Sequence, residues 1–133
     1  MNTNPHSFRS WLLGCALLVL GTAGCSKSAE DKPSGASCPA TPTLTYSNFA
    51  QGFFDKYCNR CHGGTVTGAA RNGAPDDHVF DTRADIFTNK DHIDEEAAAG
   101  PTVVNKAMPP SGLAPTDAER RQLGEWLACN APE

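Results

Sequence analysis

The five residues Cys58-Asn59-Arg60-Cys61-His62 constrain the fold of this chain more than any other feature. They place two thiols and an imidazole within little more than one helical turn. The stretch before them carries aromatic residues three and four positions apart, which form one face of a helix: Tyr46, Phe49, Phe53 and Tyr57, with Phe54 widening the face. Gly63 and Gly64 follow directly and end this helix. We therefore expect a helix whose last turn presents the three reactive side chains together.

Two cysteines separated by two residues and followed at once by a histidine form the attachment pattern of c-type haem. Each thiol adds across one haem vinyl group, and the two-residue spacing lets both sulfurs reach the same edge of the ring. His62 then lies beneath the iron, where its imidazole becomes the proximal ligand. The sequence therefore predicts one covalent haem c, attached through Cys58 and Cys61 and ligated by His62.

Three other uses of Cys58 and Cys61 remain open at this stage. A thioredoxin-like thiol pair needs a strand–helix pattern around it, and that pattern is absent. A zinc site with four thiolates would recruit Cys38 and Cys129. A plain disulfide between Cys58 and Cys61 is the third alternative. The export signal described below favours haem, because c-type attachment takes place outside the cytoplasm in bacteria.

A second iron ligand is predicted in the loop that contains Met108-Pro109-Pro110. Met108 is the only methionine besides Met1. A methionine that packs in a core is expected on an apolar helical stripe, and Met108 does not lie on one. Two prolines stiffen the loop behind it. His/Met ligation is typical of electron transfer, since it raises the reduction potential. His78 and His92 are the alternative distal ligands, although each has polar neighbours.

Residues 1–24 have the order of segments found in a secretory signal peptide: a polar start with Arg9, an apolar run and a small-residue end. The apolar run Trp11–Leu20 is too short to cross roughly 30 Å of hydrocarbon. Leu20–Cys25 resembles the lipobox of bacterial lipoproteins, which makes Cys25 the predicted lipid anchor. We expect an exported protein on the periplasmic side of a bacterial membrane. Ser26 favours the outer membrane.

The remaining cysteines, Cys38 and Cys129, are predicted to form a disulfide, because an exported compartment permits one. The segment 25–43 is rich in Ser, Pro, Ala and Thr and lacks large apolar residues. Such a composition cannot bury a core, so the segment is predicted to be a lipid-anchored flexible tether. The folded domain then occupies residues 44–133.

Charge bears on the expected partners. The whole chain has 11 basic and 15 acidic residues, and removal of residues 1–24 takes away Arg9 as the only charged residue, which changes the net charge from −4 to −5. This balance disfavours nucleic acid and anionic membrane surfaces, and it suits redox donor and acceptor proteins with a basic docking face.

The rest of the chain has helical patterns and no convincing alternation for a sheet, so the fold class is predicted to be all-α. Two capping boxes open helices at Thr82–Asp85 and Thr116–Glu119. A helical run at Ile93–Ala99 is ended by Gly100-Pro101. The segments 65–78 and 102–115 are expected to be loops.

From about Leu44 to Pro132 the chain resembles a class I, monohaem cytochrome c domain. The matching features are the motif Cys58–His62, the loop Met108-Pro109-Pro110 and the closing helix with Glu125-Trp126-Leu127. The resemblance implies N- and C-terminal helices that cross over the covalently bound haem. It also implies contact of Phe49 or Phe53 with Leu123, Trp126 or Leu127.

The resemblance further implies a role for Pro75, since a proline carbonyl after the motif often accepts the N–H of the proximal histidine in this family. The implied function is electron transfer without a small-molecule substrate, alone or as a subunit of a larger oxidoreductase, because iron bound by His62 and Met108 has no open position. The alternative is a haem-based sensor or a peroxidase-like enzyme whose distal ligand can be displaced.

Overall fold

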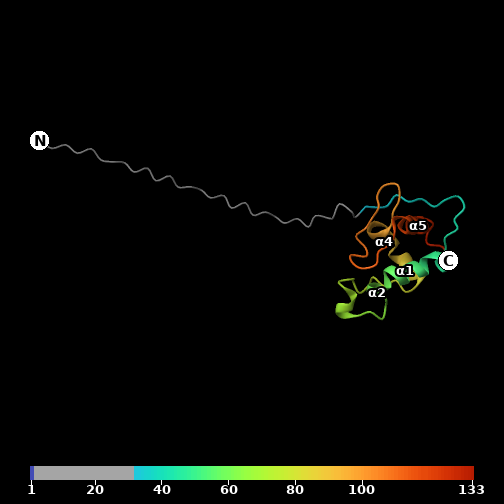
Figure 1. The fold of residues 1–133 in the computed structure, drawn as a ribbon, viewed down its shortest axis with the longest axis horizontal. Helices are drawn as coiled ribbons and strands as arrows, with labels where there is room; N and C mark the ends of the chain where they lie inside the picture. Colours follow the sequence, from blue (N-terminus) through green and yellow to red (C-terminus); the bar gives the residue numbers. More distant parts are fainter. Residues whose placement is uncertain (2–31) are drawn as a thin grey trace.

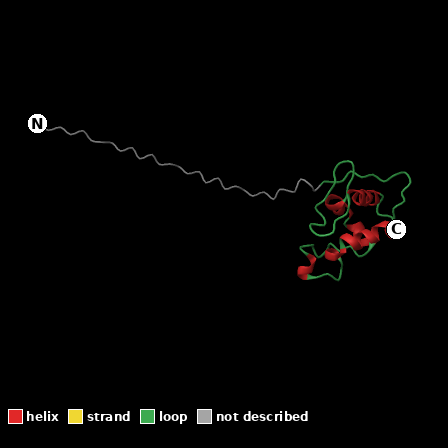
Figure 2. Cartoon of the chain, viewed as in Figure 1, coloured by secondary structure: helices red, strands yellow, loops and turns green. Residues whose placement is uncertain are grey.

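The computed structural model describes Met1 and residues 32–133; the predicted signal at 1–24 and the predicted anchor Cys25 fall largely or wholly outside the described residues. Residues 32–133 form helices and loops, and the only extended pairing among them is an isolated bridge between Ala99 and Val104 (Figure 2). The prediction of an all-α fold is confirmed at that level. The helices are, in chain order, η1 (Tyr46–Ala50), α1 (Gln51–Tyr57), α2 (Asn59–His62), η2 (Gly68–Arg71), α3 (Arg83–Thr88), α4 (Lys90–Ala97) and α5 (Asp117–Ala128).

Threonine side chains begin three of these helices. Thr45, Thr82 and Thr116 each accept a hydrogen bond from the backbone N–H three residues later, and each is part of a full capping box. Helix α4 ends at Ala97, two residues before the end expected from the sequence. The reason is that the Ala99 N–H donates to the Arg120 carbonyl of α5, 2.9 Å away, instead of continuing the helix.

The core lies between α1, α4 and α5, which are seen together in Figure 1. Trp126 and Leu123 of α5 are fully buried. The ring of α1 that meets Trp126 is Phe54, with 6.3 Å between ring centroids, whereas the sequence analysis expected Phe49 or Phe53 in such a contact. Phe53 instead contacts Tyr57 within α1, with ring centroids 5.0 Å apart and the ring planes tilted by 60°.

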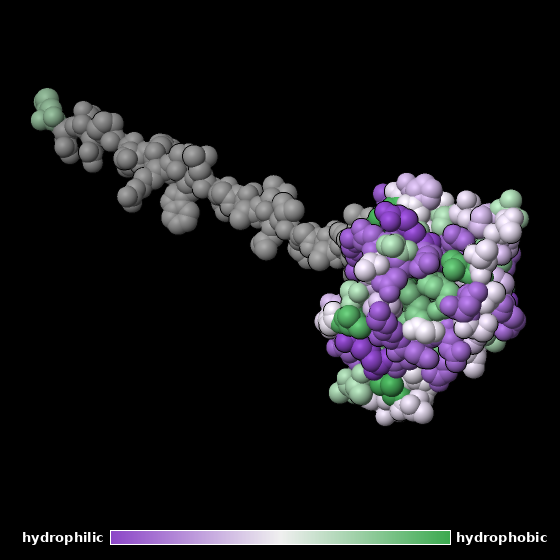
Figure 3. Space-filling model, turned by 45° about the vertical axis from the view of Figure 1, so that its right-hand side comes forward, coloured by the Kyte–Doolittle hydropathy of each residue, from purple (hydrophilic) through white to green (hydrophobic). Residues whose placement is uncertain are grey.

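This core does not cover every large apolar side chain of the domain. On the face drawn in Figure 3, apolar residues gather in the middle and hydrophilic residues surround them. Phe87, Met108 and Leu113 are 40%, 37% and 58% exposed. So small a domain buries a limited share of its apolar surface by itself.

The described part of the predicted tether, residues 32–43, is attached to the domain by hydrogen bonds. Ser34 is fully buried, and its N–H and hydroxyl donate to the two carboxylate oxygens of Asp94 in α4, at 2.7 and 2.5 Å. Asn105 also donates to the Lys32 carbonyl, at 2.8 Å. Composition did not reveal this attachment, because it depends on polar contacts with distant residues rather than on apolar burial.

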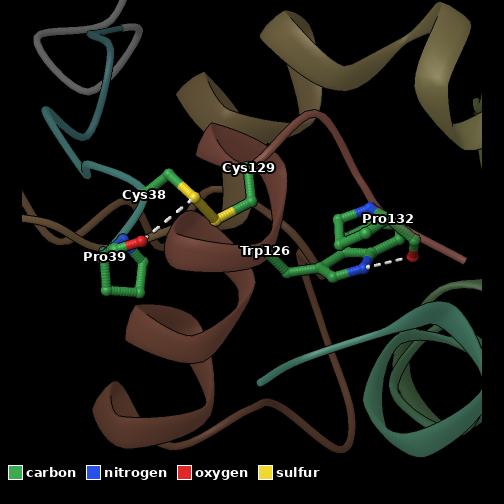
Figure 4. The surroundings of a disulfide bond; sticks show 5 residues. All are labelled: Cys38, Pro39, Trp126, Cys129 and Pro132. Atoms are coloured by element: carbon green, nitrogen blue, oxygen red, sulfur yellow. Dashed lines mark hydrogen bonds between the residues drawn. A yellow bond between two sulfur atoms is a disulfide. The ribbon is translucent and has the colours of Figure 1, made fainter. Parts of the chain in front are cut away.

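Cys38 and Cys129 form a disulfide, as predicted (Figure 4). It joins the segment before η1 to the end of α5, across 91 positions of sequence. Nearby, the Trp126 indole N–H donates to the Pro132 carbonyl at 3.1 Å, and the Tyr46 N–H donates to the same carbonyl at 2.9 Å. The two ends of the domain are therefore held together by covalent and hydrogen bonds.

Replacing both Cys38 and Cys129 with alanine is expected to lower the free energy of unfolding by about 2–4 kcal/mol, because the unfolded chain gains the freedom of a long open loop. Urea denaturation of the two proteins measures this difference. Equal midpoints and slopes would show that the disulfide does not stabilise the domain.

Glu119 connects α5 to α1. Its carboxylate accepts from the Thr116 N–H and hydroxyl, both at 2.8 Å, and from the Tyr57 hydroxyl at 2.7 Å. The backbone hydrogen bond from Thr116, followed by the bond from Tyr57, lowers the pKa of Glu119 to about 2. A carboxylate with a lowered pKa stabilises the fold above its unfolded pKa, and this contribution is lost as the pH falls towards 2.

Glu119→Gln is therefore expected to lower the melting temperature by a few degrees at pH 7, since a lost capping interaction is worth about 1 kcal/mol. The difference from the original protein should shrink as the pH falls from about 4.5 to 2. Thermal melts across this range test the prediction, with Glu125→Gln of the same helix as the control. A deficit that stays constant with pH would contradict it.

Candidate functional site

A cavity of about 290 Å³ lies beside the Cys58–His62 motif. This volume is close to the lower end of the range of about 300–1,000 Å³ typical of small-molecule and cofactor sites. Five segments line it: α1, the motif, the segment from Arg71 to Phe80, α4, and the loop from Met108 to Pro115. Aromatic, aliphatic and proline side chains form much of the wall, and the polar groups come from a few residues. The cavity suits a largely apolar ligand with a small number of polar contacts.

The two motif thiols lie together at one wall of this cavity. Cys58 is the C-terminal cap of α1, and Cys61 belongs to α2. The N–H groups of Cys61 and His62 donate to the Cys58 carbonyl, at 3.1 and 3.0 Å. Both thiols are free and partly buried. The turn of chain therefore holds two unbonded thiols and an imidazole around one space.

Burial raises the pKa of the Cys58 thiol to about 12. Reactive redox thiols have a lowered pKa instead, so this thiol lacks the character of a thioredoxin-like nucleophile. The four-thiolate zinc alternative is wrong, because Cys38 and Cys129 are bonded to each other. A disulfide between Cys58 and Cys61 is also not present in the structure.

His62 has a fixed orientation and a defined tautomer. Its Nδ1 lies 2.9 Å from the His78 carbonyl oxygen, and because a carbonyl only accepts, Nδ1 carries the hydrogen. The lone pair is then on Nε2, the nitrogen left free to bind a metal. The Phe80 ring stacks on the imidazole at 4.4 Å between centroids. Burial is the main cause that lowers the pKa of His62, which favours the neutral, ligating form.

The carbonyl that receives this hydrogen bond belongs to His78, so the expectation that Pro75 fills this role is wrong. The Pro75 carbonyl accepts instead from the Arg71 guanidinium. Segment 65–78 offers few sequence landmarks, so the residue whose carbonyl faces His62 is hard to identify from the sequence. It contains the short helix η2 and the left-handed residues Asn72 and Gly73.

Met108 lines the same cavity, although it lies 46 residues after His62 in the chain. Its backbone is held on both sides: the Met108 N–H donates to the Glu96 carbonyl at 3.0 Å, and Arg120 donates to the Met108 carbonyl at 2.9 Å. Arg120 is 2% exposed, and the same nitrogen also donates to the carbonyls of Ala97 and Asn105. The loop therefore presents Met108 from a firmly attached backbone.

Sequence reasoning missed Arg120 and Arg71, the two buried arginines that hold the loops of the site. The spacing of Arg120 to Leu123 and Leu127 puts it on the buried face of α5, a signal that the sequence did contain. Arg71 ends the short helix η2, in a segment rich in small residues, and gave no such signal.

His78 and His92 also line the cavity. The His78 ring is stacked near His62, with 6.4 Å between centroids, and the His92 ring lies 4.9 Å from His78. His62, His78 and His92 therefore follow one another as neighbouring rings along the cavity. Neither is part of a cluster of three or more potential metal-binding side chains within residues 32–133.

The chain gave no match in comparisons with models of known protein families, with curated proteins or with solved structures. In the part of the chain that the structure describes, every helix is too short or too polar to cross a membrane.

Proposed function

We propose that this protein is an electron carrier that holds one c-type haem in the cavity beside Cys58, Cys61 and His62. The observation that carries the proposal is that two free thiols, an oriented imidazole and a thioether from a distant loop all line one largely apolar cavity. This donor set fits haem c: two thiols for the vinyl groups, one nitrogen and one sulfur for the iron. When bound there, haem supplies a one-electron couple between ferric and ferrous iron.

Each residue of the site has a distinct task in this proposal. Cys58 and Cys61 bind the cofactor covalently, so that it stays with the exported protein. His62 is oriented by its bond to the His78 carbonyl, which fixes the ligand in place and adjusts its basicity. Met108 would supply the second protein ligand to the iron, and this would exclude substrate molecules from the metal. The apolar wall would keep water away from the iron. Such surroundings favour the ferrous state, because it carries one positive charge less than the ferric state.

The fold proposed to accompany this function is that of a cytochrome c domain, with the N- and C-terminal helices crossing above the cofactor. The contact of Phe54 with Trp126 and the bond of Tyr57 to Glu119 connect the corresponding helices, α1 and α5. We further propose export, anchoring through Cys25 on the periplasmic side of a bacterial membrane, preferably the outer one, and redox partners with a basic docking face.

The proposal is tested by expression of the full chain in bacteria that possess haem-maturation machinery. Mass spectrometry of the denatured, purified protein should show the mass of one haem added to the chain, and peptide mapping should place it on the segment with Cys58 and Cys61. A chain mass without haem would contradict the proposal.

The second candidate is a haem-based sensor or peroxidase-like enzyme, and the observation that favours it is the partial exposure of Met108. Exposure of a ligand makes its displacement by a small molecule easier. Addition of carbon monoxide to the reduced protein separates the two functions: an unchanged spectrum supports the carrier, and rapid binding supports the sensor or enzyme.

A further inference from the structure

Arg71 is a buried cation at the wall of the cavity. It is 5% exposed, and its guanidinium donates to four backbone carbonyls of its own loop. These carbonyls belong to Val66 (3.3 Å), Ala74 (3.1 Å), Pro75 and His78 (3.1 Å). A guanidinium keeps its charge at any ordinary pH. The loop is therefore folded around a permanent positive charge.

One of these carbonyls also serves His62. The His78 oxygen accepts from His62 Nδ1 at 2.9 Å and from Arg71 Nη2 at 3.1 Å. A carbonyl that accepts from the imidazole makes this ligand more basic and richer in electrons. A cation on the same oxygen withdraws electron density from it and weakens that effect. Arg71 thus acts on His62 through a shared acceptor.

Within residues 32–133, the carboxylate paired with Arg71 in the structure lies at the surface of the domain. The Arg71 guanidinium forms an ion pair with Asp76, with 3.4 Å between Nε and Oδ1. The Asp76 carboxylate is fully exposed to water. An exposed carboxylate is screened by solvent, whereas a buried charge acts more strongly on its surroundings. The field of Arg71 is therefore felt within the cavity.

We propose that Arg71 is a positioning residue for His62 that holds the reduction potential of the bound iron high. The proposal rests on the proposed haem site. Its two effects have the same sign: a less basic His62 and a nearby positive charge both favour ferrous over ferric iron. Arg71 thereby sets the range of partners from which the carrier can accept an electron.

The test compares Arg71→Met and Arg71→Lys in the haem-loaded full chain. Arg71→Met is expected to shift the ratio of ferric to ferrous iron at a fixed potential about tenfold towards ferric, which is about 59 mV for one electron. Arg71→Lys keeps the charge but loses the forked hydrogen bonds, so a smaller shift is expected. In the ferrous protein, the His62 Nδ1 proton resonance should move to lower field in Arg71→Met, because its hydrogen bond becomes stronger.

Arg83→Met is the matched control. Arg83 also donates to two backbone carbonyls, those of Ala131 and Asn130, but it does not line the cavity. This variant should lower the melting temperature without a change in potential. An Arg71→Met protein that holds haem at the original potential would overturn the proposal and leave Arg71 a purely structural residue.

Asp76→Asn provides a test that does not depend on the fold tolerating the loss of Arg71, since Asp76 is fully exposed. Removing its negative charge should raise the potential, and by more than Asp77→Asn does. Equal shifts for the two variants would count against the proposal. Absence of haem from the unaltered protein would instead overturn the proposed function itself, so the two failures are distinguishable.

Discussion

With Cys58 and Cys61 both replaced by alanine, the exported protein is expected to lose nearly all covalently bound haem. The two thiols are the free ones among residues 32–133, and they lie at the wall of the cavity. Without them no thioether can form, and the two remaining ligands, His62 and Met108, would hold haem only reversibly. Haem content per chain after denaturation and acid extraction measures the effect, and Cys61→Ala alone should give an intermediate loss.

The disulfide supplies a matched control for this experiment. A variant with alanine at Cys38 and Cys129 also loses two cysteines, but neither lines the cavity. It should retain one haem per chain while its stability falls. If both double variants held equal amounts of covalent haem, the assignment of Cys58 and Cys61 would be wrong.

Met108→Ala is expected to leave the haem attached while the reduction potential falls by on the order of 0.1 V or more, within the range of roughly 0.8 V that axial ligands control. Loss of the thioether removes the ligand that stabilises ferrous iron and opens one position of the metal. The oxidised protein should lose its weak far-red band, and the reduced protein should bind carbon monoxide. Potentiometric titration followed in the visible spectrum measures both changes.

Leu113→Ala is the control on the same loop, since Leu113 is 58% exposed. It should leave the potential and the far-red band unchanged. If Met108→Ala behaved like Leu113→Ala, the distal ligand would have to be sought elsewhere, with His92 as the first residue to replace.

Local patterns predicted much of this fold. The capping boxes at Thr82 and Thr116 begin helices where the sequence placed them, because capping depends on residues three positions apart. The stripe of Leu123, Trp126 and Leu127 is buried as predicted, because residues three and four positions apart share one face of a helix. The disulfide was predictable because few cysteines remained once those of the motif were assigned.

The features that the sequence did not reveal depend on distant partners. Ser34 is buried because Asp94 accepts both of its hydrogen bonds, and Ala99 leaves α4 because Arg120 offers it a carbonyl. The acceptor for His62 was assigned to Pro75 rather than His78, since the course of a loop depends on where Arg71 gathers its carbonyls. Polar contacts across a fold leave no periodic pattern in the sequence.

The most direct test of the central claim is the visible spectrum of the mature protein, oxidised and reduced, from cells that can mature c-type haem. A sharp reduced band of the c type, together with a weak far-red methionine–iron band in the oxidised form, is the predicted result. It would establish the cofactor and its ligation by His62 and Met108 at once. A protein with no haem absorption in either state would contradict the account.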